Sequence, residues 1–207
     1  MADSKGSPGV DRSASLIAVS SRLLSNTPNQ HRIGGGRPVR VAAVDDTFDD
    51  LLAANRRYAN SAPRNFDGYA HAGIAVVTCM DSRLQPLEMI GLFLGEAKIL
   101  RTPGGHVTPD ALAGCILGVD LLRVDRILVV SHSKCAIASG TDADLARRIN
   151  DATGLDANGY TFDADPDQTG RIRADVKLLA EHPLIAGRAT VGGFHYDVET
   201  GLLERVC

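Results

Sequence analysis

The sequence has no tryptophan, only 4% aromatic residues, and no excess of positive charge. Its 22 Lys and Arg are set against 25 Asp and Glu, so the net charge is −3 and the pI is near 6.0. Without a basic patch interleaved with aromatic side chains, nothing in the sequence points to nucleic-acid binding. No apolar run approaches the ~20 residues that a membrane-spanning helix needs. The chain has 207 residues, 44% hydrophobic and 23% charged, which is typical of one globular domain.

Cysteine is also scarce, with four residues in the whole chain. Two disulfides would use all four cysteines. Two observations argue against them: the chain is not a small secreted scaffold, and Cys79 and Cys135 both lie at the polar ends of predicted strands. We therefore expect reduced thiols and a cytoplasmic protein. Cys115 falls in a predicted helix and is expected to be a small buried apolar residue. Cys207 is the last residue, and we expect it to be frayed and without a role.

The first 44 residues are rich in Ser, Gly, Pro, Asn and Arg, and a Gly-Gly-Gly-Arg-Pro cluster over 34–38 is typical of a linker. We predict a disordered tail over 1–44 and a single folded domain over 45–207. The short apolar segment in the tail is broken by Ser20, Ser21 and Arg22, which argues against a signal peptide. An organellar transit peptide is the alternative reading, favoured by arginine and serine and opposed by two aspartates.

Apolar runs and turn residues divide the rest of the chain into alternating strands and helices. Strands are predicted over 73–78, 97–101, 126–131, 188–194 and 196–198, with a C-terminal hairpin edge over 202–206. Helices are predicted over 45–60, after Pro86, and over 109–122, 142–151 and 168–181. The order predicts an α/β fold with a parallel-centred sheet flanked by helices. The helix over 45–60, capped by Asp45 or Asp46, has an apolar stripe that could pack on its own sheet or on a partner subunit.

Two predicted strands end in residues that bind zinc. The first runs into Cys79, and the third runs into His132 and Cys135. Ligands of open α/β sheets sit beyond the carboxyl ends of the strands, so we expect these three side chains to meet. No fourth Cys or His stands at zinc-site spacing. Three protein ligands leave a position open for water, whose pKa zinc lowers toward ~7.

Asp81 and Arg83 follow Cys79 at a spacing that points both side chains to one face of an extended segment. An Asp–Arg pair can be bidentate and can hold the carboxylate off the metal, where it would orient a bound water. If the pair breaks, Asp81 could become the fourth zinc ligand and close the site. An isolated Asp-Ser-Arg is usually a solvated turn. Here the tripeptide follows the candidate ligand Cys79 closely, which favours a functional role.

Other polar and glycine residues near these strand ends carry weaker signals. Gly104 and Gly105 form a turn after a strand and are candidate substrate-binding residues, because their backbone can approach the metal crevice closely. His106 beside them is expected at the surface, and Lys134 is expected to be solvated. The three remaining histidines of the predicted domain are expected at the surface or in satisfied positions: His71, His182 and His195.

Cys79-x-Asp81-Ser82-Arg83 followed by His132-x-x-Cys135 resembles the signature of the β-class carbonic anhydrases, and the short spacing is similar to that of the compact bacterial subgroup. The resemblance extends in layout over residues 45–206. It implies that Cys79, His132 and Cys135 bind one Zn²⁺ per subunit and that Asp81 and Arg83 form the catalytic dyad. It also implies a homodimer or tetramer in which the helix over 45–60 lies across the partner.

The reaction implied by the resemblance is the reversible hydration of carbon dioxide to bicarbonate and a proton by zinc-bound hydroxide. The chain departs from the usual pattern in three places: Ala136 stands where Gly usually follows the second Cys, Thr102-Pro103 stands where Asn usually follows the arginine, and Ser131 stands where Gly or His commonly precedes the ligand histidine. Because none of them removes a ligand, they bear on the substrate more than on the metal. The alternatives are hydrolysis of carbonyl sulfide or carbon disulfide at the same site, and a zinc-binding relative without turnover. A dinucleotide-binding domain is disfavoured, because the G-x-G-x-x-G pattern is missing.

Overall fold

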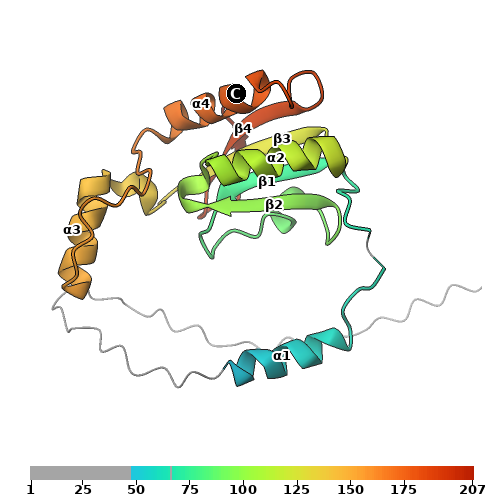
Figure 1. The fold of residues 1–207 in the computed structure, drawn as a ribbon, viewed down its shortest axis with the longest axis horizontal. Coiled ribbons are helices and arrows are strands. Elements are labelled where there is room, and N and C mark those ends of the chain that lie inside the picture. The colour runs from blue at the N-terminus through green and yellow to red at the C-terminus, as the bar shows by residue number, and fades with distance from the viewer. Residues whose placement is uncertain (1–47, 66) are drawn as a thin grey trace, which may run out of the picture. The chain divides into compact units, whose positions relative to one another are not determined.

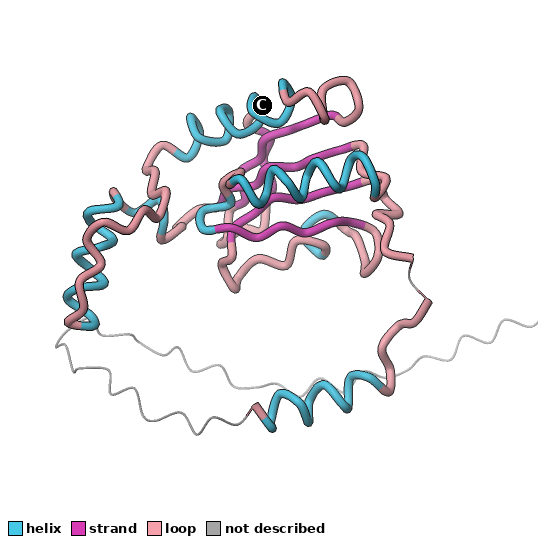
Figure 2. The backbone as a smooth tube through the Cα atoms, in the orientation of Figure 1, coloured by secondary structure: helices cyan, strands magenta, loops and turns pink. Residues whose placement is uncertain are grey.

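The computed structural model describes residues 48–65 and 67–207, and within them a five-stranded sheet forms the centre of the fold (Figures 1 and 2). The strands lie in the order β2-β1-β3-β4-β5. Their bounds are Ile74–Cys79 for β1, Ala97–Thr102 for β2, Arg126–His132 for β3, Thr190–Tyr196 for β4 and Leu203–Arg205 for β5. The first four pair in parallel, and β5 pairs antiparallel to β4. The predicted α/β fold with a C-terminal hairpin edge is confirmed.

Strand β1 lies at the middle of the parallel part and is buried along its whole length. Its side chains alternate between the two faces of the sheet, as a strand requires. Ala75 and Val77 join one apolar cluster, whereas Ile74 and Val76 join another. This two-sided burial explains why the sequence of β1 is a continuous apolar run instead of an alternating one.

Helices α2 (Pro109–Leu121) and α4 (Gln168–Glu181) pack on the same face of the sheet (Figure 1). Cys115 of α2 and Leu179 of α4 are fully buried in that cluster. Thr108 caps α2, since its side chain accepts a hydrogen bond from the N–H of Ala111 at 3.3 Å. The segment between β1 and β2, which includes a 3₁₀ turn over Glu88–Ile90, covers the other face.

Helix α3 (Asp142–Thr153) connects the site region to α4 and begins at a capping box formed by Thr141 and Asp144. Gly154 ends it in a left-handed conformation. The Asp144 pKa is lowered to about 2, first because the backbone N–H of Thr141 donates to its carboxylate.

Helix α1 (Asp49–Ala59) contains no buried residue. Its apolar side chains are exposed, with Phe48 at 67%, Leu51 at 60% and Leu52 at 53%. Phe48 occupies the cap position and makes no side-chain cap bond. The predicted tail over 1–44 and the predicted caps Asp45 and Asp46 lie outside the described residues.

Two sequence predictions near the C-terminus are wrong. Instead of separate strands over 188–194 and 196–198, the structure has the single strand β4 over Thr190–Tyr196, because β3 pairs with it without a break as far as Tyr196. Cys207 is not frayed. Its carbonyl accepts from the N–H of Gly193 at 3.0 Å, so the last residue extends the hairpin edge.

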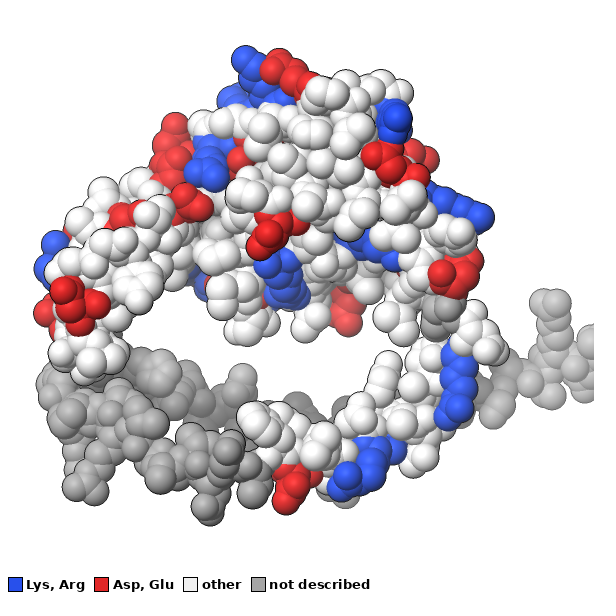
Figure 3. Space-filling model, in the orientation of Figure 1, with Lys and Arg blue, Asp and Glu red and all other residues white. Residues whose placement is uncertain are grey.

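Charges of both signs are interspersed among uncharged side chains on the face of the described residues that Figure 3 shows, as the sequence composition predicts. In the described part of the chain, none of the helices combines the length and apolar character needed to cross a membrane.

Candidate active site and metal centre

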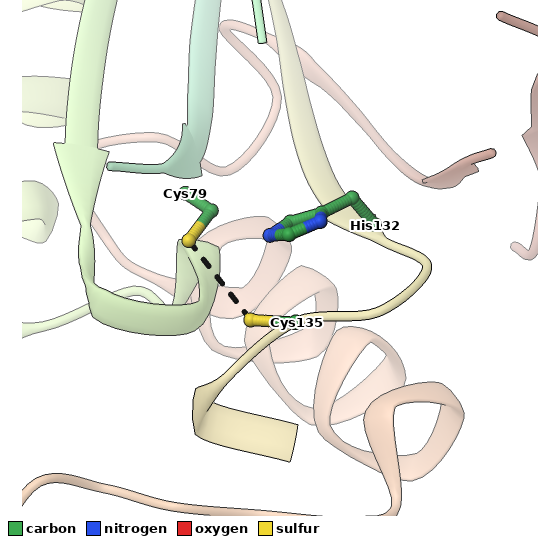
Figure 4. Close-up of side chains that lie close together, drawn as sticks. All are labelled: Cys79, His132 and Cys135. Carbon is green, nitrogen blue, oxygen red and sulfur yellow. Dashed lines mark hydrogen bonds between the residues drawn. The ribbon is translucent and has the colours of Figure 1, made fainter. Parts of the chain in front are cut away.

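The site lies where β1 and β3 end. These strands are parallel neighbours, with Thr78 opposite Val130, so both chains leave the sheet at the same edge. Cys79 is the last residue of β1, and His132 is the last residue of β3. A short turn after β3 then brings Cys135 back toward both of them (Figure 4).

The three side chains meet, and all three are buried. Their ligand atoms lie within 4.8 Å of one another, and the two sulfurs are 4.0 Å apart. Two thiolates held by one tetrahedral zinc at ~2.3 Å would lie about 3.8 Å apart, so the observed spacing suits that ion. Figure 4 shows the two sulfurs and the imidazole pointing into one space.

The imidazole of His132 provides a second test of the fit. Its Nδ1 lies 2.9 Å from the carbonyl oxygen of Ser133, which only accepts, so the proton of the neutral ring is on Nδ1. Nε2 is then a lone-pair donor. It is buried and has no hydrogen-bond partner in the described part of the chain. A buried nitrogen without a partner is costly in an empty protein interior and is satisfied by a metal ion.

The two cysteines of this group behave as a pair. The hydrogen bond between them lowers the pKa of Cys79 and raises the pKa of Cys135. The N–H groups of Asp81 and Gly104 also lower the pKa of Cys79. The site therefore favours a negative sulfur even without a cation, which is the form that binds a metal.

Asp81 and Arg83 form a bidentate pair at the rim of this group. The Arg83 Nε donates to Asp81 Oδ1 at 2.9 Å, and its Nη2 donates to Oδ2 at 2.7 Å. The backbone N–H of Arg83 donates to Oδ1 as well. Together these bonds hold the pKa of Asp81 far below its usual value. Oδ2 lies 3.9 Å from His132 Nε2, so the ionised carboxylate stands beside the three donor atoms.

Arg101, whose role was not predicted from the sequence, also shapes this geometry. From the end of β2, its guanidinium donates to the carbonyls of Asp81 at 3.1 Å and Leu84 at 2.7 Å, and it lies 3.5 Å from that of Cys79. The Arg101 guanidinium thus holds the loop that carries Asp81 and Arg83. The only signal in the sequence was an arginine at a strand end, which is too common to be informative.

Gly104 and Gly105 lie behind the site, and both are buried with φ of 72° and 76°. A Cβ on Gly105 would come within 2.7 Å of the Val130 carbonyl and 3.1 Å of the Cys79 nitrogen. The position therefore requires glycine because two strands approach it closely. Contact with a substrate stays a prediction.

The prediction that His106 lies at the surface is wrong. Its ring is 5% exposed and lies over Gly104, and Nδ1 has no partner among the described residues. Burial lowers the pKa of His106. Helix α4 lies beside it, and the Asp175 carboxylate of α4 accepts from the N–H of Val107 at 3.2 Å. His195 is satisfied, as predicted, by the Ser131 hydroxyl 2.8 Å from its Nδ1.

Comparison with known proteins identifies the family. The family model described as carbonic anhydrase matches residues 74–203. The chain is also 32% identical over 158 residues to β-carbonic anhydrase 1 of Mycobacterium tuberculosis, an alignment that covers 76% of this chain and 96% of that protein. The chain belongs to the β-carbonic anhydrase family. Members of this family are zinc enzymes, and Cys79, His132 and Cys135 form the group of this member that could hold a metal.

Two further relatives show the range of the family. A carbonic anhydrase from Streptococcus mutans has a similar fold, with a TM-score of 0.69 and 32% identity over 77% of this chain and 97% of that one. A carbon disulfide hydrolase from Acidithiobacillus thiooxidans is 26% identical over 149 residues, which cover 62% of this chain and 74% of the relative. Proteins similar to this chain thus include one named for a sulfur-containing substrate.

Proposed function

We propose that this protein is a zinc-dependent carbonic anhydrase that reversibly hydrates carbon dioxide to bicarbonate and a proton. The observation that carries the proposal is that His132 Nε2, which has no hydrogen-bond partner among the described residues, shares a buried space with two cysteine sulfurs beside the paired Asp81 carboxylate. A purely structural zinc site would need no such carboxylate. Zinc held by Cys79, His132 and Cys135 would supply a water acidified enough to act as a nucleophile near neutral pH.

The residues of the chain would then orient the reaction. In this proposal Arg83 keeps both oxygens of Asp81 engaged, so the carboxylate stays off the metal and the site is in its open form. An ionised Asp81 would accept a hydrogen bond from the attacking water and so point the lone pair of that water at the substrate carbon. Arg101 keeps the Asp81 backbone in place while negative charge develops on the substrate oxygens. If the Asp81–Arg83 pair opened, the carboxylate could reach the metal and close the site.

A second substrate class has support from the shape of the entrance. The cavity over the site has a volume of about 520 Å³ and is lined in part by the apolar residues Met80, Ala136 and Ile137. An apolar wall of this kind suits carbon disulfide or carbonyl sulfide as well as carbon dioxide, since all are small and linear. The relationship to a carbon disulfide hydrolase points the same way.

We further propose that the protein works as a homodimer or tetramer in the cytoplasm. The exposed apolar stripe of α1 is costly in a single copy and would be covered by a partner subunit. The cysteines in the described part of the chain are all free thiols, which fits a reducing compartment.

Product analysis separates the candidate reactions. Zinc-loaded protein is offered carbon dioxide, carbonyl sulfide and carbon disulfide separately, with proton release measured for the first and hydrogen sulfide for the others. We expect proton release from carbon dioxide to be fastest. Hydrogen sulfide production without accelerated hydration of carbon dioxide would assign the sulfur substrates instead. One zinc per chain with neither product would indicate a zinc-binding relative without turnover.

A further inference from the structure

Lys134 lies between His132 and Cys135 and has an unusual backbone conformation. Its φ is 57°, in the left-handed region that residues other than glycine seldom adopt. Such conformations persist where their surroundings fix them, and they concentrate at functional sites. Lysine has no side-chain feature that favours a positive φ, so the reason lies in what the backbone does there.

The Lys134 backbone binds the arginine of the proposed dyad. Its carbonyl oxygen accepts a hydrogen bond from Arg83 Nη2 at 3.1 Å. The same nitrogen donates to Asp81 Oδ2 at 2.7 Å. One nitrogen thus connects the turn that carries Cys135 to the carboxylate that follows Cys79. The two segments are 51 residues apart in the chain and meet only because β1 and β3 are neighbours.

The Lys134 side chain does not account for the conformation. Its ammonium pairs with Glu199 in the turn between β4 and β5, but the two side chains are 57% and 66% exposed. Ion pairs this exposed contribute little to stability. Arg83, in contrast, has a side chain 45% exposed and would sample many rotamers if Asp81 were its sole acceptor.

We propose that Lys134 is a positioning residue: its left-handed backbone aims a carbonyl at Arg83 and thereby keeps the guanidinium where it holds Asp81. The catalytic consequence rests on the proposed function, whereas the placement of Arg83 does not. Because the backbone of Lys134 has this role, substitutions that tolerate a positive φ should keep Arg83 in place, and those that do not should release it.

Three variants make this separation. Lys134→Gly removes the side chain but adopts a positive φ at no steric cost. Lys134→Val also removes the side chain, and a β-branched residue strongly disfavours that conformation. Glu199→Gln removes the charge that pairs with the lysine and leaves the backbone alone. If Lys134→Val fails to fold by circular dichroism, Lys134→Ala takes its place in the comparison with Lys134→Gly.

The primary readout is the reactivity of Arg83 toward an arginine-specific dicarbonyl reagent, followed by peptide mass spectrometry. It is measured on metal-free protein, so a variant that binds zinc weakly still gives a result. We expect Arg83 to react several-fold faster in Lys134→Val than in the wild type, and at the wild-type rate in Lys134→Gly and Glu199→Gln. Equal rates in Lys134→Val and the wild type would overturn the proposal. So would a rate in Lys134→Gly as high as in Lys134→Val, because the side chain would then be responsible.

The catalytic readout is the hydration of carbon dioxide by zinc-loaded protein, normalised to zinc content. A lost hydrogen bond to a charged group predicts a fall in kcat of roughly tenfold or more for Lys134→Val, with little change in KM. The kcat of Lys134→Gly should lie much closer to that of the wild type than to that of Lys134→Val. If the wild type hydrates no carbon dioxide, the proposed function fails, and the Arg83 reactivity still tests the positioning role.

Discussion

His132 is the residue whose surroundings determine the chemistry of the site. The Ser133 carbonyl accepts a hydrogen bond from its Nδ1–H, which leaves Nε2 with a buried lone pair facing two sulfurs. Neither Cys79 nor Cys135 alone would indicate more than a buried thiol. The metal site arises because three such donors converge from the ends of two neighbouring strands, β1 and β3.

Removal of one donor should remove the metal. We expect Cys79→Ser and His132→Ala to lose most of the one zinc per chain, because two remaining ligands bind zinc far more weakly than three. Metal content measured after gel filtration in metal-free buffer gives the result. Cys115→Ala is the matched control, because it removes an equally buried thiol from α2. Full zinc content in either ligand variant would refute the assignment.

Removal of the carboxylate should leave the metal and abolish most of the turnover. Asp81→Ala loses the group proposed to orient the attacking water, so we expect kcat to fall by roughly 10²–10⁴-fold at unchanged zinc content. Asp125→Ala is the control, because Asp125 also lies near an arginine, Arg126 at 3.7 Å, but away from the site. If Asp81→Ala retained full activity, the dyad would have no catalytic role.

At the scale of the elements, β1, β3 and α2 place the site. Parallel pairing of β1 with β3 brings their carboxyl ends to one edge, and α2 packs behind them in the main apolar cluster. Local signals specify these elements well. Thr108-Pro109 begins α2, and the apolar run of β1 ends where its burial ends.

The cap of α2 is a test at this scale. Thr108→Ala should lower the free energy of unfolding by about 1 kcal/mol, because the N–H of Ala111 loses its acceptor. Urea denaturation followed by circular dichroism measures it. Thr108→Ser keeps a hydroxyl at the cap and should lose much less. Equal losses in both variants would show that the hydroxyl is not what stabilises the start of the helix.

Sequence predicted most elements of the fold and the residues that meet at the site, because apolar periodicity and strand-end chemistry are local properties. The contacts it missed are between distant segments. His106 is buried beside α4, where Asp175 accepts from the N–H of Val107, 68 residues away. Arg101 reaches carbonyls on a neighbouring strand's loop, and Cys207 pairs with Gly193 across the hairpin edge. Partners of this kind are set by how distant segments pack, so the sequence around each residue contains no pattern that predicts them.

At the scale of the whole molecule, the exposed stripe of α1 predicts self-association. Leu52→Asp places a charge on that stripe and should shift the protein toward monomer in sedimentation velocity. Arg57→Asp, about half a turn around the helix from the stripe, should leave the assembly as in the wild type. A wild-type protein that sediments as a monomer at all concentrations would contradict the proposed oligomer.

Carbon dioxide hydration by stopped flow, on protein with one zinc per chain and from mildly acidic to alkaline pH, tests the central claim most directly. We predict rapid turnover that rises with pH, and its loss in Asp81→Ala at equal zinc content. An abrupt loss of wild-type turnover at low pH would indicate closure of the site by Asp81. No turnover at any pH, with zinc fully bound, would contradict the assignment as a carbonic anhydrase.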